Sequence, residues 1–331
     1  MSTPLLEVRN LSVEFRQRGG AVRAVQDVGF ALQAGRTFAL VGESGSGKSV
    51  TSLAIMRLLA APAGRITGGA VLLHAEGRTL DLVQLSEREM RRVRGRLAAM
   101  VFQEPMTSLN PVLPVGEQIA EVLRLHLGMD HGAAAKQAVH LLDRVGIPDA
   151  PRRAREYPHE LSGGMRQRVM IAIALACKPL LMIADEPTTA LDVTIQAQML
   201  ALIRELQDET GMAVLFITHN LGVVAEIADD VAVMYGGQFV ETGATADVLA
   251  RPRHPYTSAL LDSLPPEIGS QAPPRQPLRA IPGGVVNLRA PPQGCRFAER
   301  CALRIDACEA APVPLRVLDD GAVRCIRAGA A

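Results

Sequence analysis

The sequence predicts an α/β domain built around a mostly parallel β-sheet, with a loop-rich extension after it. Through the first 250 residues, short apolar runs bounded by glycine, proline or aspartate alternate with segments of helical periodicity. Alternation of this kind is typical of the α/β class. The expected strands are Thr37–Val41, Ala98–Phe102, Leu180–Ala184, Ala213–Thr218 and Val231–Tyr235. The expected helices are Ser49–Leu59, Val115–Leu125, Ala133–Val145, Met165–Cys177, Thr194–Glu209 and Leu221–Ile227.

The order of these segments divides the chain into parts. Between about residues 111 and 179 helices follow one another without a strand, which predicts a helical subdomain inserted into the sheet domain. From about Arg251 proline becomes frequent and long helical patterns end. We therefore expect one large domain over residues 1–250 and a separate C-terminal extension over residues 251–331.

Composition excludes several classes of protein. Aromatic residues make up 3% of the chain and tryptophan is absent, which argues against surfaces that stack on bases. The 35 basic and 34 acidic residues are balanced, so nucleic acid is not an expected partner. Apolar runs such as Val169–Cys177 are about half of the roughly 18 residues that a membrane span needs. With no signal peptide in Met1–Asn10, we expect a cytosolic chain that reaches a membrane through partners.

A glycine-rich loop follows the first predicted strand of the sheet and opens a predicted helix. Residues 42–49 fit the pattern G-x-x-x-x-G-K-[ST], which cradles phosphate groups. Glycines let successive N–H groups point at phosphate oxygens, and the helix N-terminus adds its positive dipole. Lys48 is expected to neutralise the β- and γ-phosphates, and the Ser49 hydroxyl to ligate Mg²⁺. The candidate nucleotide-binding residues here are Gly42, Glu43, Ser44, Gly45, Ser46, Gly47, Lys48, Ser49 and Val50.

Two carboxylates end the apolar strand at residues 180–184. Alone, Asp185 and Glu186 are compatible with an ordinary acidic turn after a buried strand. Beside a phosphate loop, Asp185 is expected to hold Mg²⁺. Glu186 is expected to polarise the attacking water as a general base.

A second glycine motif carries a resemblance to a known family. Residues 161–168, Leu-Ser-Gly-Gly-Met-Arg-Gln-Arg, resemble the signature sequence of ABC transporter ATPases. The resemblance implies a P-loop NTPase fold with a RecA-like parallel core, an antiparallel β subdomain and a helical subdomain. It also implies a head-to-tail dimer, in which Ser162, Gly163 and Gly164 of one subunit cap the ATP held by the other.

The remaining motifs of that family occur in order along the chain. Gln103 resembles the Q-loop glutamine that senses Mg²⁺ and contacts membrane subunits, and Ala190-Leu191-Asp192 resembles the D-loop at the dimer interface. His219 resembles the switch histidine that contacts the γ-phosphate. Phe15 has the position of the aromatic residue that stacks on adenine, and a core phenylalanine is an equal alternative. The family thus implies Glu186, His219 and Gln103 as catalytic residues, and Ser49, Gln103 and Asp185 around Mg²⁺.

Three further segments resemble the oligopeptide/dipeptide (peptide/nickel) importer ATPases, and most of all their D-type subunit. These segments are Gln103–Pro111, Thr188–Gln196 and Arg253–Thr257, with Glu104 standing where aspartate is more usual. The implied partners are two transmembrane permeases, a second ABC ATPase and an extracytoplasmic peptide-binding protein, at the cytoplasmic face of the inner membrane. Nickel chelates or glutathione are alternative cargoes, and a soluble ABC ATPase outside transport is the alternative class.

Four of the five cysteines gather in the extension with the spacing C-x5-C-x6-C-x16-C, at Cys295, Cys301, Cys308 and Cys325. The short knuckles of structural zinc sites are missing from this spacing. A [4Fe–4S] cluster, a zinc ion and unmetallated thiols remain open, and the resemblance favours the cluster, which some importer ATPases of this group carry. Cys177 is expected to be a buried small apolar residue.

Overall fold

The computed structural model describes residues 3–18, 20–104, 108–189, 192–264 and 281–328. The chain forms two compact units, each made of several segments. The first unit comprises Met1–Glu7, Ala31–Thr37 and Val71–Ile217. The second comprises Val8–Phe30, Phe38–Ala70 and Thr218–Ala331.

Parallel strands form the centre of the first unit. Strand β7 (Leu181–Asp185) pairs in parallel with β6 (Ala98–Val101) on one side and with β8 (Ala213–Thr218) on the other. Every residue of β7 and β8 is buried, as expected for strands covered on both faces. The expected strand at residues 213–218 is confirmed at both ends.

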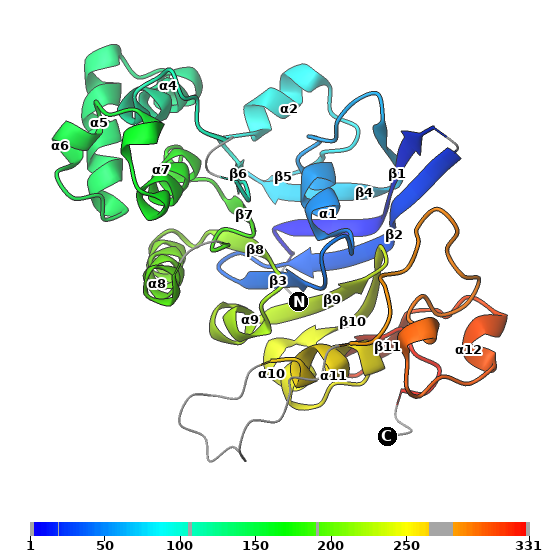
Figure 1. The fold of residues 1–331 in the computed structure, drawn as a ribbon. Coiled ribbons are helices and arrows are strands. Elements are labelled where there is room, and N and C mark those ends of the chain that lie inside the picture. Colours follow the sequence, from blue (N-terminus) through cyan, green and yellow to red (C-terminus); the bar gives the residue numbers. More distant parts are fainter. Residues whose placement is uncertain (1–2, 19, 105–107, 190–191, 265–280, 329–331) are drawn as a thin grey trace, which may run out of the picture. The chain divides into compact units, whose positions relative to one another are not determined.

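Between β6 and β7 the described part of the chain contains helices joined by turns, and no strand. Figure 1 shows α4 to α7 as one group, drawn in green. Their bounds are α4 Val115–Leu127, α5 His131–Arg144, α6 Ala150–Arg153 and α7 Gly163–Leu175, with a 3-10 turn at Pro158–Glu160. The unit also contains α2 (Glu87–Val93), α8 (Val193–Thr210) and β5 (Arg78–Asp81), which pairs antiparallel with residues 72–75 of β4 (Gly64–Ala75).

Side chains cap the N-termini of several of the described helices, among them α5, α7 and α8. Asp130, Ser162 and Asp192 each accept a hydrogen bond from a backbone N–H of the helix they precede, at the start of α5, α7 and α8. Such caps satisfy N–H groups that have no partner within the helix. Glycine in the left-handed conformation ends α4 and α8, at Gly128 and Gly211.

The second unit holds a sheet to which the C-terminal extension contributes strands. Strand β3 (Thr37–Val41) runs parallel to β9 (Asp230–Tyr235), and β10 (Gln238–Ala244) returns antiparallel to β9. The hairpin of β11 (Arg316–Leu318) and β12 (Gly321–Val323) then adds antiparallel to β10. The sequence did not predict this hairpin, so the extension contains more regular structure than expected.

Longer strands and short helices complete the second unit. Strands β1 (Leu6–Gln17) and β4 (Gly64–Ala75) are neighbours in a second sheet, and β2 (Gly20–Leu32) lies beside β1. The helices are α1 Lys48–Ile55, α9 Leu221–Ile227, α10 Thr245–Ala250, α11 Pro255–Asp262 and α12 Ala307–Ala310, with a 3-10 turn at Ala298–Arg300.

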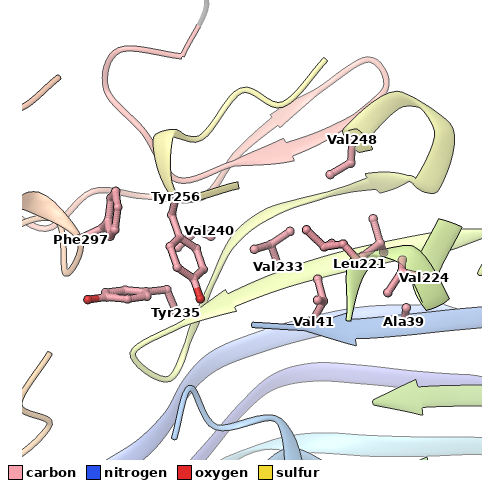
Figure 2. Close-up of a cluster of buried hydrophobic side chains, with 11 residues drawn as sticks. Ala39, Val41, Leu221, Val224, Val233, Tyr235, Val240, Val248, Tyr256 and Phe297 are labelled. Carbon is pink, nitrogen blue, oxygen red and sulfur yellow. The ribbon is translucent and has the colours of Figure 1, made fainter. Parts of the chain in front are cut away.

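The core of the second unit joins its sheet to the extension. Figure 2 shows Val41 of β3 and Val233 of β9 in the same buried cluster as Tyr256 of α11 and Phe297. Tyr235, at the end of β9, packs against both aromatic rings of the extension, with centroids 4.7 Å from Tyr256 and 5.3 Å from Phe297. Burial of aromatic rings contributes strongly to stability. The extension is therefore packed into the core of this unit.

Candidate functional site

The glycine-rich loop of the second unit connects the buried strand β3 to α1. Gly42 and Gly47 have φ angles of 158° and 108°. A Cβ atom at Gly42 would lie 2.1 Å from the Met234 carbonyl oxygen, and one at Gly47 would lie 2.8 Å from the Ala24 carbonyl oxygen. Only glycine fits such close approaches of the backbone. The loop can therefore hold its curled shape only with glycine at these two positions.

Lys48, the first residue of α1, places its amine against the loop. Its side chain is buried, and Nζ donates hydrogen bonds to the carbonyl oxygens of Gly42 (2.8 Å) and Glu43 (3.0 Å). The Ser46 N–H also donates to the Glu43 carbonyl, at 3.2 Å. A cation and a helix N-terminus at one glycine-rich turn form a site for an anion.

Ser46 supplies a further observation that fits a phosphate ligand. Its hydroxyl is buried and, among the described residues, has no hydrogen-bond partner. A buried polar atom without a partner is uncommon in native structures and calls for a ligand or water to satisfy it. The donors of the loop therefore fit the phosphates of a nucleotide.

The acidic pair lies in the first unit, at the end of β7. Asp185 is buried, and Glu186 has a left-handed backbone with φ of 47°, which is uncommon for a residue with a side chain. The Glu186 N–H donates to the Ile217 carbonyl (2.9 Å), so the residue is anchored to β8. Its carboxylate accepts hydrogen bonds from Gln103 Nε2 (3.1 Å) and Thr189 Oγ1 (3.0 Å). The structure thus brings the expected base and the expected glutamine together.

The signature segment begins α7 in the first unit. Ser162 caps this helix by accepting a hydrogen bond from the Met165 N–H at 3.3 Å. Ser162 and Gly163 are exposed, and a Cβ atom at Gly163 would meet no atom within 4 Å. This helix N-terminus is therefore open to an anion.

The local surroundings of Asp192 and His219 do not by themselves indicate a nucleotide-binding role. The Asp192 side chain accepts a hydrogen bond from the Ile195 N–H (2.9 Å) and so caps α8. Ala190 and Leu191 of the same motif lie outside the described residues. His219 is exposed in the second unit, directly after β8, while Phe15 is half-buried on β1.

The expected site residues are divided between the two units. The phosphate loop, His219 and Phe15 belong to the second unit, whereas Gln103, Asp185, Glu186, Asp192 and the signature residues belong to the first.

Two residues of the extension contact the phosphate loop and were not predicted to do so. Arg300 forms a salt bridge with the Glu43 carboxylate at 2.6 Å. The Tyr256 hydroxyl accepts a hydrogen bond from the Glu43 N–H at 2.9 Å. Tyr256 lies in a segment that resembles importer ATPases, yet nothing in its spacing pointed to the loop, and Arg300 had no sequence signal.

The four clustered cysteines line one small cavity of about 20 Å³ in the extension. The cavity is otherwise lined mainly by apolar side chains, including Phe297, Leu303 and Val313. All four are free thiols, and burial raises the pKa of Cys295 to about 11. Within the described parts of the chain, no group of three or more histidine, cysteine, aspartate or glutamate residues is arranged to hold a metal ion.

Cys177 differs slightly from the expectation. It follows the end of α7 and is half-buried, with its Sγ 4.0 Å from the Val122 carbonyl oxygen. Burial raises the pKa of its thiol, which keeps it protonated near neutral pH.

Comparison with known proteins gives the family. Residues 25–189 match the family model described as ABC transporter, and residues 240–308 match the model described as oligopeptide/dipeptide transporter, C-terminal region. A peptide import ATP-binding protein of Brucella melitensis is 55% identical over 98% of this chain and 97% of its own length. The oligopeptide transport ATP-binding protein OppD of Bacillus subtilis is 54% identical over 92% of this chain and 84% of its own length.

Solved structures show the same fold. A dimeric ATP-binding cassette, MJ0796 bound to ADP and Pi, matches with a TM-score of 0.64 and 26% identity, over 72% of this chain and 98% of the cassette. CbiO1 of Clostridium perfringens, part of an ABC transporter complex, matches with a TM-score of 0.61 and 25% identity, over 76% of this chain and 92% of its own. The fold and site define a P-loop ATP-binding cassette, and the expected fold class is confirmed. The chain belongs to the ABC transporter family of ATP-binding proteins and carries the C-terminal region of oligopeptide/dipeptide transporters.

Proposed function

We propose that this chain is the ATP-hydrolysing subunit of an ABC importer that takes up dipeptides or oligopeptides through separate permease subunits. The observation that carries the proposal is the match over nearly the whole chain to peptide import ATP-binding proteins. The glycine-rich loop, with Lys48 Nζ hydrogen-bonded to the Gly42 carbonyl oxygen, supports it. Among the described residues, no helix is long and apolar enough to cross a membrane. In the proposed importer, separate permease subunits form the pore, and this chain is held at the cytoplasmic face of the inner membrane.

The proposed chemistry is hydrolysis of Mg²⁺-ATP. The loop from Gly42 to Ser49, with Val50, binds the triphosphate, and Ser49, Gln103 and Asp185 hold Mg²⁺. Glu186 accepts a proton from the attacking water, and its anchored carboxylate supports this role because a general base must be held in one position. His219 contacts the γ-phosphate, and Phe15 stacks on adenine.

The proposed assembly contains two cassettes. Ser162, Gly163 and Gly164 cap the nucleotide of the partner cassette, and Asp192 lies at the same interface. The exposed N-terminus of α7 supports this role, and so does the dimeric state of the solved cassette MJ0796. Two permeases and an extracytoplasmic peptide-binding protein complete the importer, with a related chain or a second copy as the partner ATPase.

We also propose that Cys295, Cys301, Cys308 and Cys325 hold a [4Fe–4S] cluster, with zinc as the alternative. The support is the donor set: four cysteines, which such clusters take as ligands, line one cavity, although the described side chains are not arranged around a metal position. Partial burial raises the pKa values of the Cys295 and Cys301 thiols and so favours their neutral form, and a cationic metal centre would compensate the charge of the thiolates. A bound cluster would supply a structural crosslink for the extension.

Uptake in a strain that lacks this chain tests the transport proposal. Complementation with the wild-type chain should restore import of a labelled tripeptide, and the Glu186→Gln variant should not restore it. Glutathione and a nickel chelate serve as comparison cargoes. Restored uptake of only a comparison cargo would overturn the peptide assignment, and restoration by Glu186→Gln would overturn the ATPase role.

Metal analysis tests the cysteine proposal separately. Anaerobically purified protein should contain iron and acid-labile sulfide, and a variant with Cys301 and Cys308 changed to serine should lose both. Replacement of Cys177 by serine is the matched control and should leave the iron content unchanged. Zinc in place of iron would support the alternative, and protein without either metal would overturn both.

A further inference from the structure

Every polar group of Glu43, the second residue of the phosphate loop, has a partner. Its N–H donates to the Tyr256 hydroxyl at 2.9 Å. Its carbonyl oxygen accepts from the Ser46 N–H at 3.2 Å and from Lys48 Nζ at 3.0 Å. Its carboxylate accepts two hydrogen bonds from the Arg300 guanidinium, at 2.6 and 3.0 Å. Glu43 thus links the lysine of the loop to two residues of the C-terminal extension.

Arg300 is itself fixed in one position. Its side chain is 4% exposed, and Nε donates to the Pro282 carbonyl at 2.9 Å. The guanidinium lies over the Tyr235 and Phe297 rings, 5.7 and 5.9 Å from their centroids. A bidentate arginine–carboxylate pair constrains direction as well as distance. The hydrogen bond to Glu43 raises the pKa of Arg300, so the guanidinium stays charged.

Tyr256 is equally constrained. It is fully buried, and its ring centroid lies 4.7 Å from that of Tyr235 and 5.2 Å from that of Phe297. Figure 2 shows the three rings in one cluster. Burial raises the pKa of the hydroxyl, which therefore remains protonated and neutral. An aromatic cluster of the core thus presents one hydroxyl to the backbone of the loop.

The contacts from Arg300 and Tyr256 both hold Glu43, which belongs to the segment of the loop where the phosphates would bind. The Glu43 carboxylate would repel nearby phosphates, and the Arg300 charge neutralises it. A loop that is already in its binding shape loses less conformational freedom when a ligand binds. We propose that Arg300 and Tyr256 are positioning residues of the nucleotide site: by fixing Glu43 they set how tightly the phosphate loop holds ATP. This inference rests on the nucleotide site proposed above and assigns the C-terminal extension a part in it.

Equilibrium titration of the full-length chain with Mg²⁺-ATP tests the inference. Arg300→Met, which is similar in length and uncharged, should weaken ATP affinity about tenfold, the loss expected for a charge-assisted contact. The double variant Glu43→Gln/Arg300→Met also removes the unpaired carboxylate and should recover only the part of that loss that phosphate repulsion causes, because residue 43 is still not held in place. In the assembled transporter, Arg300→Met should raise the KM for ATP and leave kcat nearly unchanged.

Arg324→Met is the matched control. Arg324 belongs to the same extension and donates to the carbonyl oxygens of Phe239 (2.9 Å) and Val313 (2.8 Å), neither of which is in the loop. This variant should lower the unfolding temperature and leave ATP affinity unchanged. Equal loss of affinity in Arg324→Met and Arg300→Met would show a general effect of the extension and overturn the inference.

The remaining outcomes also test the inference. A folded Arg300→Met protein that binds ATP with wild-type affinity overturns the inference, and so does a double variant that regains wild-type affinity, because holding Glu43 in place would then contribute nothing. If Arg300→Met does not fold, Arg300→Lys keeps the charge without the fork geometry and should still weaken ATP binding severalfold; wild-type affinity in that variant counts against the inference. Wild-type protein that does not bind ATP, or binds it as Lys48→Ala does, would instead overturn the proposed nucleotide site.

Discussion

The side-chain amide of Gln103 donates a hydrogen bond of 3.1 Å to the carboxylate of Glu186. These residues are separated by 83 positions and are brought together at the carboxyl ends of β6 and β7, which pair in parallel. The contact joins the residue expected to sense the membrane partner to the residue expected to activate water. A substitution or movement of one of these residues should therefore alter the position of the other.

Glu186→Gln should abolish most ATP hydrolysis and spare ATP binding. The substitution keeps the size of the side chain and removes the proton acceptor, so kcat should fall by about 10²–10⁴-fold. Phosphate release and ATP titration measure the two effects separately. Glu209→Gln, which changes an exposed carboxylate paired with Arg144, is the control and should hydrolyse ATP at the normal rate.

Lys48→Ala should weaken ATP binding. The change removes a charge-assisted contact worth about 1.5–3 kcal/mol, so the Kd for ATP should rise by about 10–100-fold. Titration with a fluorescent ATP analogue measures the shift. Hydrolysis by Lys48→Ala at the wild-type rate would contradict the assignment of the loop.

Gly47→Ala should destabilise the second unit and impair nucleotide binding together. The new Cβ would lie 2.8 Å from the Ala24 carbonyl oxygen, on a residue whose φ is 108°. We expect the free energy of unfolding, measured by urea denaturation, to fall by about 1–3 kcal/mol. Gly68→Ala is the control, because a Cβ there meets no atom within 4 Å and Gly68 lacks a positive φ. Equal stability of the two variants would show that the close approach is tolerated.

His254 should make the protein less stable in mild acid. Burial lowers its pKa from 6.5 to about 3, and its Nδ1 accepts a hydrogen bond from the Tyr256 N–H at 3.0 Å. Between pH 6.5 and about 3 the unfolded chain binds a proton at this residue and the folded chain does not, so stability falls as the pH falls. The contribution of His254 is complete above pH 6.5.

Denaturation at several pH values tests this expectation. The wild type should lose up to about 1.4 kcal/mol per pH unit from this residue across that window. His254→Asn keeps an acceptor for the Tyr256 N–H and does not titrate there, so its stability should fall less steeply. Identical slopes for the two proteins would remove His254 as the cause.

Much of the fold could be predicted because its central elements carry local signals. The apolar runs at residues 37–41 and 213–218 lie between turn residues and became β3 and β8 without a shift of boundary. The glycine pattern of the loop and the two carboxylates after β7 are short motifs with a direct chemical meaning. The long strands β1 and β2 alternate less regularly in burial, so their sequences gave weaker periodicity.

The contacts of Glu43 could not be predicted, because they depend on packing between distant segments. Arg300 is 257 residues from Glu43, and no spacing rule relates the two. Tyr256 reaches the loop only because its ring joins the core beside Tyr235. The hairpin of β11 and β12 was missed for a similar reason, since each strand has only three residues and is defined by its pairing.

The pairing of β10 with β12 has a consequence for how the protein is made. Until residues 321–323 have left the ribosome, β10 has a partner only in β9, and its other side is an open strand edge. Such an edge can pair with another nascent chain and lead to aggregation. A polypeptide that ends at residue 250, where the expected large domain ends, would contain β10 without β12 and would carry this open edge permanently.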